Sequence, residues 1–451
     1  MPRARQLHLT AFLSPGGYHE SAWRVVPDDP RTVLGLPFYA GLARIAERAC
    51  LDALFMADNI AIAEYRVQYL PQALFDPVEL LAALAGVTER IGLIATGSTT
   101  YSAPWELARR FATLDFLSAG RAGWNIVTTR SVLAAANFGG SAHPALSARY
   151  EQAAEFVDAV LAVWDSWEDD ALVGSRERGV WAERSKLHAP RFRGEHYQVA
   201  GILPFPRSPQ GHPVLVQAGS STAGVSLAAR HAELVFTRQP TAEAAASFRG
   251  ELRAQAAAAG RDPDHVHVLP ALAFTLADTE AGARERQAEL EALASPEFRW
   301  RNMLWMIGLD PDGPFDPGEP LPEEIINGPA PSSGAEPVFA AARAERIPLG
   351  ELARRHAGMP NALTFVGTPE QLAGFIETWW RAGAVDGFTL MANVLPEGLA
   401  LFAEHCLPLL RARGLFREGY EGTTLREHLG VPRPPGRRAG APAPGCDTSR
   451  P

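Results

Sequence analysis

The chain has 451 residues, of which 47% are hydrophobic, and this composition is typical of a globular protein with a large buried core. Its formal net charge of −9 argues against a general nucleic-acid-binding role, and no apolar run is long enough to cross a membrane. The three cysteines lie far apart without CxxC spacing, so a disulfide framework or a zinc site is disfavoured and a reducing cytoplasm is predicted.

Short apolar runs alternate with amphipathic helical patterns along the chain. The first half predicts, in order, the strand Leu7–Leu13, the helix Phe38–Cys50, the strand Ala53–Ala57, the helix Pro77–Val87, the strand Ile91–Ala95, the helix Pro104–Leu117, the strand Ala122–Val127 and the helix Arg149–Trp167. The second half predicts the strand Pro213–Gln217, the helix Ala223–His231, the strand Glu233–Thr237, the helix Thr241–Gly260, the strand Val266–Leu276, the helices Thr279–Leu293 and Pro369–Ala382, the strand Gly387–Met391 and a closing helix Glu397–Arg413.

Eight strands that alternate with helices indicate a parallel sheet with helical crossovers, and eight units favour a closed (β/α)₈ barrel. The competing fold is an open doubly wound sheet, but no GxGxxG motif opens a helix. We expect one domain over residues 1–432, with insertions at about 168–211 and 295–360. The Pro/Gly/Arg-rich tail over residues 433–451 is predicted to be disordered.

In such a barrel, functional residues lie where strands end and the following loops begin. This rule selects His19 after the first strand, Asp58 after the second, Thr96–Thr100 after the third, and Asn125 with Thr128–Arg130 after the fourth. These positions are rich in hydroxyls and amides, and no HExxH, GxSxG or Walker motif is present.

The AGSSTAG stretch at residues 218–224 follows the fifth strand and is a candidate anion site. Its glycines, the hydroxyls of Ser220 and Ser221 and the amides of a helix start suit a phosphate. An ordinary serine helix cap explains the same residues equally well. Asp58 is either a structural cap or a hydrogen-bond acceptor in the pocket, and Tyr150 either donates to an anion or packs beneath a loop. His19 is either a solvated loop histidine or a catalytic one.

Six blocks of sequence carry a resemblance to a known family. They are LTAF, ALFMAD, ATGSTTYSAPWELARRFATLDFLSAGRAGWNIVTT, NFGG, RYEQAAEFVDAVLAVWDSWEDDA and PVLVQAGSSTAG. Over about residues 7–427 the chain resembles the nitrilotriacetate monooxygenase component A group of the bacterial luciferase-like superfamily. The resemblance implies an interrupted (β/α)₈ barrel of that type.

The resemblance also implies a flavin-dependent monooxygenase. Such enzymes use reduced FMN, supplied by a separate NAD(P)H:flavin reductase, and O₂ to oxygenate a small organic substrate. On the matching positions, Asp58, Thr96, Thr129, Arg130, Tyr150, Ser220 and Ser221 are implied to bind the cofactor. His19 and Asn125 are implied to lie at the reacting centre. The family tends to form homodimers or homotetramers, with no membrane or nucleic-acid partner.

The chain departs from the family pattern next to Tyr150. Relatives often carry a histidine four residues earlier, in an HDxRY motif, and this position is Leu146 here, with His143 nearby. An alkane substrate is not supported, because alkane-oxidising relatives have a tyrosine where this chain has Ala63. Two alternative functions remain open: a deazaflavin (F420)-dependent oxidoreductase of the same superfamily, and a flavin-binding protein without turnover.

Overall fold

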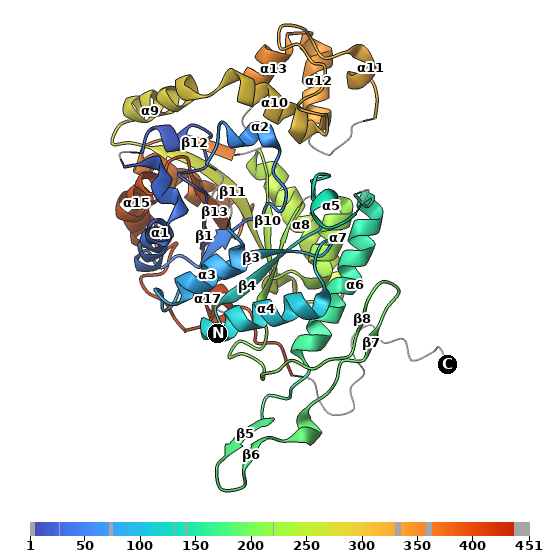
Figure 1. Ribbon diagram of the computed structural model, residues 1–451. Coiled ribbons are helices and arrows are strands. Elements are labelled where there is room, and N and C mark those ends of the chain that lie inside the picture. Colours follow the sequence, from blue (N-terminus) through green and yellow to red (C-terminus); the bar gives the residue numbers. More distant parts are fainter. Residues whose placement is uncertain are drawn as a thin grey trace.

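Eight parallel strands close into a barrel, which confirms the predicted fold (Figure 1). The structure is a computed structural model that describes residues 5–26, 28–71, 75–129, 131–140, 143–219, 221–329, 335–356 and 363–436. Around the ring the strands are β1 (His8–Phe12), β2 (Ala53–Met56), β3 (Gly92–Ser98), β4 (Ala122–Val127), β9 (Val214–Ala218), β10 (Leu234–Thr237), β11 (His267–Leu276) and β13 (Gly387–Ala392). Pairing of β13 with β1 closes the ring.

Helices form the outer layer, and polar side chains define where several of them begin. The main ones are α1 (Leu36–Arg48), α3 (Pro77–Ala85), α4 (Pro104–Leu117), α6 (Leu146–Trp164), α7 (Thr222–His231), α8 (Ala242–Ala258), α9 (Glu280–Leu293) and α14 (Pro369–Arg381). Asp76 accepts hydrogen bonds from the first amides of α3, and Pro77 occupies a position where no amide is needed. Thr279 caps α9 in the same way, through the Gly282 amide.

Successive side chains of each barrel strand point alternately outward, towards the helices, and inward, so the protein has two hydrophobic cores. In β4, Trp124 points outward and packs against Phe111 and Phe156 of the surrounding helices, with ring centroids 5.8 and 6.1 Å away. Side chains at the alternate positions of each strand point inward. Two of them, Ile94 of β3 and Val216 of β9, belong to a separate cluster of buried apolar side chains inside the barrel. The inward or outward direction of a residue near a strand end therefore follows from its position in the strand.

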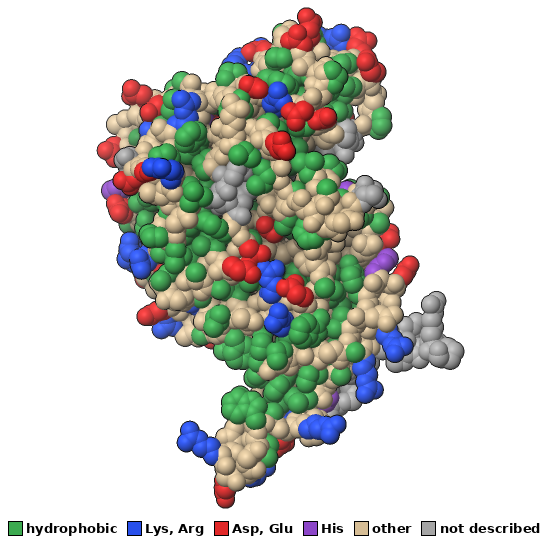
Figure 2. All heavy atoms as spheres, in the orientation of Figure 1, with side chains coloured by type: hydrophobic (Ala, Val, Ile, Leu, Met, Phe, Trp, Pro, Cys, Tyr) green, Lys and Arg blue, Asp and Glu red, His purple; other side chains and the backbone are tan. Residues whose placement is uncertain are grey.

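The two regions predicted as insertions differ in structure. Residues 168–211 contain two antiparallel hairpins, β5 (Leu172–Ser175) with β6 (Val180–Ala182) and β7 (Phe192–Arg193) with β8 (Gln198–Val199). Residues 296–356 contain α10 (Pro296–Ile307), α11 (Glu323–Ile326), α12 (Ala335–Glu345) and α13 (Leu349–His356), which share a small core of their own. In Figures 1 and 2 this helical unit forms a lobe above the barrel, on the side of the short helices α2 (Glu64–Val67) and α5 (Ala134–Asn137).

One strand was not predicted. β12 (Leu363–Gly367) pairs in parallel with the second half of β11, outside the closed ring. Only one of its five residues is fully buried, so its sequence lacks the apolar run that marks the barrel strands. β11 is long enough to pair with β10 near its beginning and with β12 near its end.

The segment that follows β13 seals the amino-terminal end of the barrel. It contains α15 (Glu397–Leu401), a π-helical turn (Phe402–Cys406), α16 (Leu407–Ala412) and α17 (Leu425–Leu429). Leu425 and Leu429 of α17 belong to the cluster inside the barrel. Arg417 forms a buried ion pair with Asp52, and Asp52 also contacts His8 Nδ1 at 3.1 Å. The barrel interior is therefore filled from this end.

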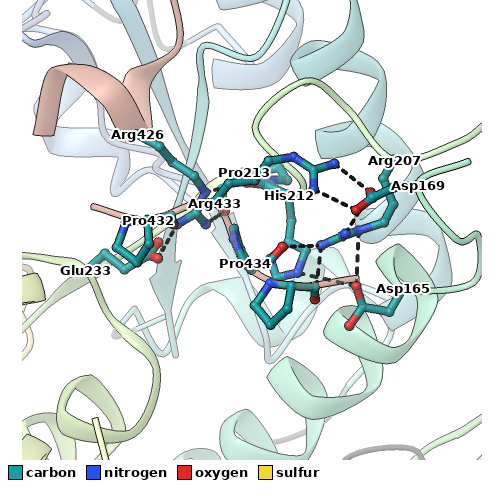
Figure 3. A network of polar contacts seen from close by, with 11 residues as sticks. Asp165, Asp169, Arg207, His212, Pro213, Glu233, Arg426, Pro432, Arg433 and Pro434 are labelled. Carbon is teal, nitrogen blue, oxygen red and sulfur yellow. Dashed lines mark hydrogen bonds and ion pairs between the residues drawn. The ribbon is translucent and has the colours of Figure 1, made fainter. Parts of the chain in front are cut away.

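A polar network extends this seal to the first insertion (Figure 3). Arg426 pairs with Glu233, and Arg433 donates to both carboxylate oxygens of Asp169 at 2.8 and 2.6 Å. Arg207 also contacts Asp169 at 2.9 Å, and it donates to the Pro434 carbonyl at 3.0 Å. Arg433 and Pro434, at the start of the predicted tail, thus lie against the first insertion. Residues 437–451 of that tail lie outside the described residues.

Within the described part of the chain, no helix is both long and apolar enough to cross a membrane.

Candidate active site

The inward-facing side chains near the carboxyl ends of the strands form an apolar floor. Phe55 of β2 contacts Phe12 and Phe236 edge to face, with ring centroids 5.7 and 5.5 Å away. Above this floor the strand ends carry the polar residues that the sequence predicted. A flat aromatic ligand could lie on such a floor with its edges towards the polar rim.

Thr96 and Asn125 are neighbours on β3 and β4, as their shared register requires. The Thr96 hydroxyl donates to the Met56 carbonyl at 2.8 Å and accepts from the Asn125 amide nitrogen at 2.8 Å. Asn125 Oδ1 is buried and has no hydrogen-bond partner among the described residues. Because a buried acceptor without a partner is costly, this oxygen is suited to receive a hydrogen bond from a ligand.

The turn after β4 is held by side chains from two directions. Thr129 has a φ of 41°, a left-handed conformation that is uncommon for threonine, and its hydroxyl lies 2.7 Å from the Ser98 hydroxyl. Arg149 donates through Nη1 to the Thr128 carbonyl at 2.9 Å and also to the Thr129 carbonyl. No carboxylate pairs with Arg149 in the described residues, so its positive charge is available to an anion nearby.

Tyr150, Ser221 and Gln217 surround a small space at the start of α7. The Ser221 hydroxyl accepts from the Gly224 amide at 3.2 Å and lies 3.4 Å from the Tyr150 hydroxyl. A Cβ atom at Gly224 would lie 3.1 Å from both hydroxyl oxygens and 3.4 Å from Gln217 Nε2. Ser221 therefore caps the helix, and its hydroxyl also lies next to the Tyr150 hydroxyl. We call the set formed by Tyr150, Gln217, Ser221 and Gly224 the cradle.

The structure shows where the departure from the family pattern lies. Leu146 begins α6 and is 54% exposed. His143 instead contacts the Tyr101 hydroxyl through Nδ1 at 2.8 Å, and the two rings stack. Burial and the charge of Arg149 lower the pKa of His143. An imidazole is thus present just before α6, at a position that the motif spacing did not identify.

Asp58 lies half-buried after β2, beside the mouth of the barrel. Burial and the negative charge of Asp76 raise the pKa of Asp58 to about 6. Near neutral pH this carboxyl can therefore accept hydrogen bonds in its ionised form or donate one when protonated.

His19 lies on the β1 side of the mouth, and both of its ring nitrogens have protein partners. Nδ1 accepts from the Ser21 amide at 3.1 Å, and Nε2 lies 3.3 Å from the Glu291 carboxylate. Since Nδ1 accepts, Nε2 carries the proton and donates to Glu291. In this arrangement the imidazole links the loop after β1 to α9, and it is not beside the cradle.

Arg130 and Ser220, both predicted to bind the cofactor, lie outside the described residues. The prediction did not include Gln217 or Arg149, and it selected Ser98 only as part of the Thr96–Thr100 stretch. A signal for Arg149 was present, because a cation that directly precedes the predicted Tyr150 occupies the same helix start. Gln217 is the last polar side chain of an apolar strand and could have been selected by the same rule as Asn125.

A flavin mononucleotide fits these residues on three structural grounds. The cradle offers hydroxyl and amide groups beside Arg149, which pairs with no carboxylate among the described residues, and this suits a phosphate. Asn125 Oδ1 and Gln217 Oε1 are buried acceptors without a partner among the described residues. The aromatic floor suits a planar ring.

These features define a (β/α)₈-barrel protein of the luciferase-like type. Residues 28–386 match the family model described as luciferase-like monooxygenase. The chain therefore belongs to the luciferase-like monooxygenase family.

Related proteins are similar to this one over nearly its whole length. It is 41% identical over 450 residues to N-acetyl-S-(2-succino)cysteine monooxygenase of Bacillus subtilis (strain 168), covering 97% of this chain and 99% of the relative. It is 38% identical to nitrilotriacetate monooxygenase component A of Aminobacter aminovorans, covering 95% and 97%.

Solved structures extend the comparison. A riboflavin lyase (RcaE) with modified FMN and the substrate riboflavin superposes with a TM-score of 0.84 at 32% identity, covering 98% of this chain and 99% of that one. An F420-dependent secondary alcohol dehydrogenase superposes with a TM-score of 0.55 at 15% identity, covering 90% and 99%, and shares the fold alone.

Proposed function

We propose that this protein is a monooxygenase that uses reduced FMN and O₂ to oxygenate a small organic substrate. The observation that carries the proposal is the cradle, where Ser221, Tyr150 and Gly224 converge beside the charge of Arg149. The named activities of the relatives support the monooxygenase class. When bound, reduced FMN would supply the electrons for O₂ activation, so no catalytic triad or metal cluster is required of the protein.

The residues divide into three roles. The cradle would hold the phosphate, with Tyr150 and Ser221 as donors and Arg149 as a compensating charge. Thr96, Asn125 and Asp58 would orient the edge of the ring, and Thr129 would position the turn against it. The apolar floor would exclude water from the reacting centre, which protects a reactive oxygen species from side reactions.

His19 is proposed to act at the reacting centre through its neighbours. Its contact with Glu291 fixes the loop after β1, and the adjacent Tyr18 packs inside the mouth. Arg130 and Ser220 are retained as cofactor-binding candidates because they flank Thr129 and Ser221 in sequence.

The proposal extends to partners and location. A separate NAD(P)H:flavin reductase would supply reduced FMN, as the resemblance to the family implies. A homodimer or homotetramer in the cytoplasm is proposed by analogy with the family. The relatives named above act on a modified cysteine and on nitrilotriacetate, so family membership alone does not select a substrate.

Two other functions make different predictions. A deazaflavin-dependent oxidoreductase would prefer F420 to FMN, and the 15% identity to such an enzyme gives it little support. A flavin-binding protein without turnover would bind reduced FMN but would form no oxygenated product. Cofactor selectivity and product formation separate the three functions.

The test is to supply FMN, NADH and a flavin reductase and to screen candidate substrates for oxygenated product. Ser221→Ala should weaken binding of reduced FMN about tenfold or more, because a donor to a charged phosphate is lost. Thr241→Ala is the matched control, since Thr241 caps α8 through the Ala244 amide at 3.2 Å and lies outside the cradle. Failure of the wild-type protein to bind reduced FMN would refute the proposal.

A further inference from the structure

Arg238 is a cation at the mouth of the barrel that the flavin site does not use. It directly follows β10, in which Leu234 and Phe236 point into the barrel interior. The same parity directs Arg238 towards the mouth. It is half-buried, and within the described residues it forms no ion pair or hydrogen bond through its guanidinium.

Tyr18 packs against the same small apolar cluster as Phe236, which precedes Arg238 by two residues. The ring of Tyr18 packs with Ala271, Ala273 and Met391 at the mouth, in the cluster that also contacts Phe236. Its hydroxyl is buried and has no hydrogen-bond partner in the described part of the chain. Burial raises the pKa of Tyr18, and the positive charge of Arg238 opposes that rise.

Two other cations near the mouth, among the described residues, are placed differently. Arg299 contacts Glu20 at 2.6 Å and Glu291 at 2.5 Å, and Glu291 also receives the contact from His19. Arg149 donates to backbone carbonyls on the β4 side, next to the cradle. Arg238 lies instead on the β10 side with Tyr18, whose packing partners come from β11 and β13.

A half-buried guanidinium without a counter-ion is unfavourable unless an anion joins it. A carboxylate matches the paired N–H groups of arginine, and a tyrosine hydroxyl can donate a third hydrogen bond. We propose that Arg238 and Tyr18 bind a carboxylate of the substrate, so that this protein acts on small organic acids. This inference rests on the proposed function, since it assigns the substrate class to the same site.

The test is isothermal titration calorimetry, in which each probe is titrated into the full-length protein saturated with FMN. The probes are glutarate and tricarballylate, each compared with its neutral methyl ester. Saturation with FMN fills the cradle, so a carboxylate that binds there instead is excluded. The variants are Arg238→Gln, Arg238→Lys and Tyr18→Phe. Arg230→Gln is the charge-matched control, because Arg230 is 51% exposed near the end of α7.

We expect the wild-type protein to bind each acid more tightly than its ester. Arg238→Gln should weaken acid binding about tenfold or more, and Arg238→Lys and Tyr18→Phe should weaken it less, by about threefold. Arg230→Gln should have no effect. In all four variants the affinity for FMN should change by less than about twofold.

Three results would overturn the inference: equal binding of acid and ester by the wild-type protein, unchanged acid affinity in Arg238→Gln, or an equal loss of acid and FMN affinity in that variant. The last result would assign Arg238 to the flavin. The proposed function fails separately, if the wild-type protein binds no reduced FMN in a titration without acid.

Discussion

If the cradle binds the phosphate, adding one methyl group there should weaken cofactor binding without preventing the protein from folding. Gly224 is the third residue of α7, and a Cβ atom there would lie 3.1 Å from the hydroxyl oxygens of Tyr150 and Ser221. Gly224→Ala would place its methyl in the space where these donors converge. Both neighbours are side-chain ends that can shift by a few tenths of an ångström, so we expect the protein to fold.

The magnitudes follow from two opposing effects. Alanine stabilises a helix by roughly 0.5–1 kcal/mol relative to glycine, and the close contacts offset part of this gain. The free energy of unfolding should therefore change by less than about 1 kcal/mol. Loss of one hydrogen bond to a charged phosphate costs about 1.5–3 kcal/mol, which weakens binding of reduced FMN about 10- to 150-fold.

The assay is anaerobic equilibrium dialysis of reduced FMN, combined with urea unfolding of the apoprotein. Gly250→Ala in α8 is the matched control, because a Cβ atom there has no neighbour within 4 Å. The control should gain stability and keep its affinity for FMN. If Gly224→Ala binds reduced FMN as tightly as Gly250→Ala, the phosphate does not lie in the cradle.

Two further predictions concern charged groups. Because the folded protein raises the pKa of Asp58 to about 6, the folded state holds an extra proton between about pH 4 and 6, and stability falls as pH rises through that range. The free energy of unfolding of Asp58→Asn apoprotein, measured with urea, should thus exceed that of the wild type by about 1–2 kcal/mol at pH 8. The difference should vanish towards pH 4, and a difference that does not change with pH would contradict this reasoning. Arg417→Met should cost about 3–5 kcal/mol because it leaves the Asp52 carboxylate buried without its ion-pair partner. Arg31→Met, which breaks an exposed pair with Asp29, should have no measurable effect, and equal losses in the two variants would refute this reasoning.

The barrel was predictable because its strands are buried on both sides. A strand such as β2 needs apolar residues towards the helices and towards the interior, and this produces a short continuous run that sequence reveals. β12 lacks this constraint, since it pairs only with the end of β11 and is largely half-buried. The helical unit was predicted only as an insertion, because its proline-rich loop hid the shorter helices around it.

α10 could have been found from its own sequence. Ser295 caps it through the Phe298 amide at 3.2 Å, Pro296 occupies its first turn and Gly308 ends it in a left-handed conformation. These are the ordinary signals for the start and end of a helix. The prediction instead weighted the glycines and prolines that follow.

The candidate site was predictable at strand ends and less so in its pairings. Position along a strand selected Thr96 and Asn125, but only the register showed that their side chains meet. His143 contacts Tyr101 through a turn that spacing cannot describe. Arg238 was not selected, because an arginine after a strand usually lies in solvent and only the absence of a described partner distinguishes it.

The seal formed by the carboxyl-terminal segment has a consequence for biosynthesis. Asp52 is paired with Arg417, 365 residues later in the chain, and the interior of the barrel is filled by Leu425 and Leu429. Chains emerge from the ribosome amino terminus first. Until synthesis is almost complete, Asp52 therefore lacks its partner Arg417, and the apolar interior of the barrel stays exposed. The nascent protein is therefore prone to aggregation or chaperone binding during most of its translation. A stop codon before residue 417 would release a chain without the segment that closes the amino-terminal end of the barrel.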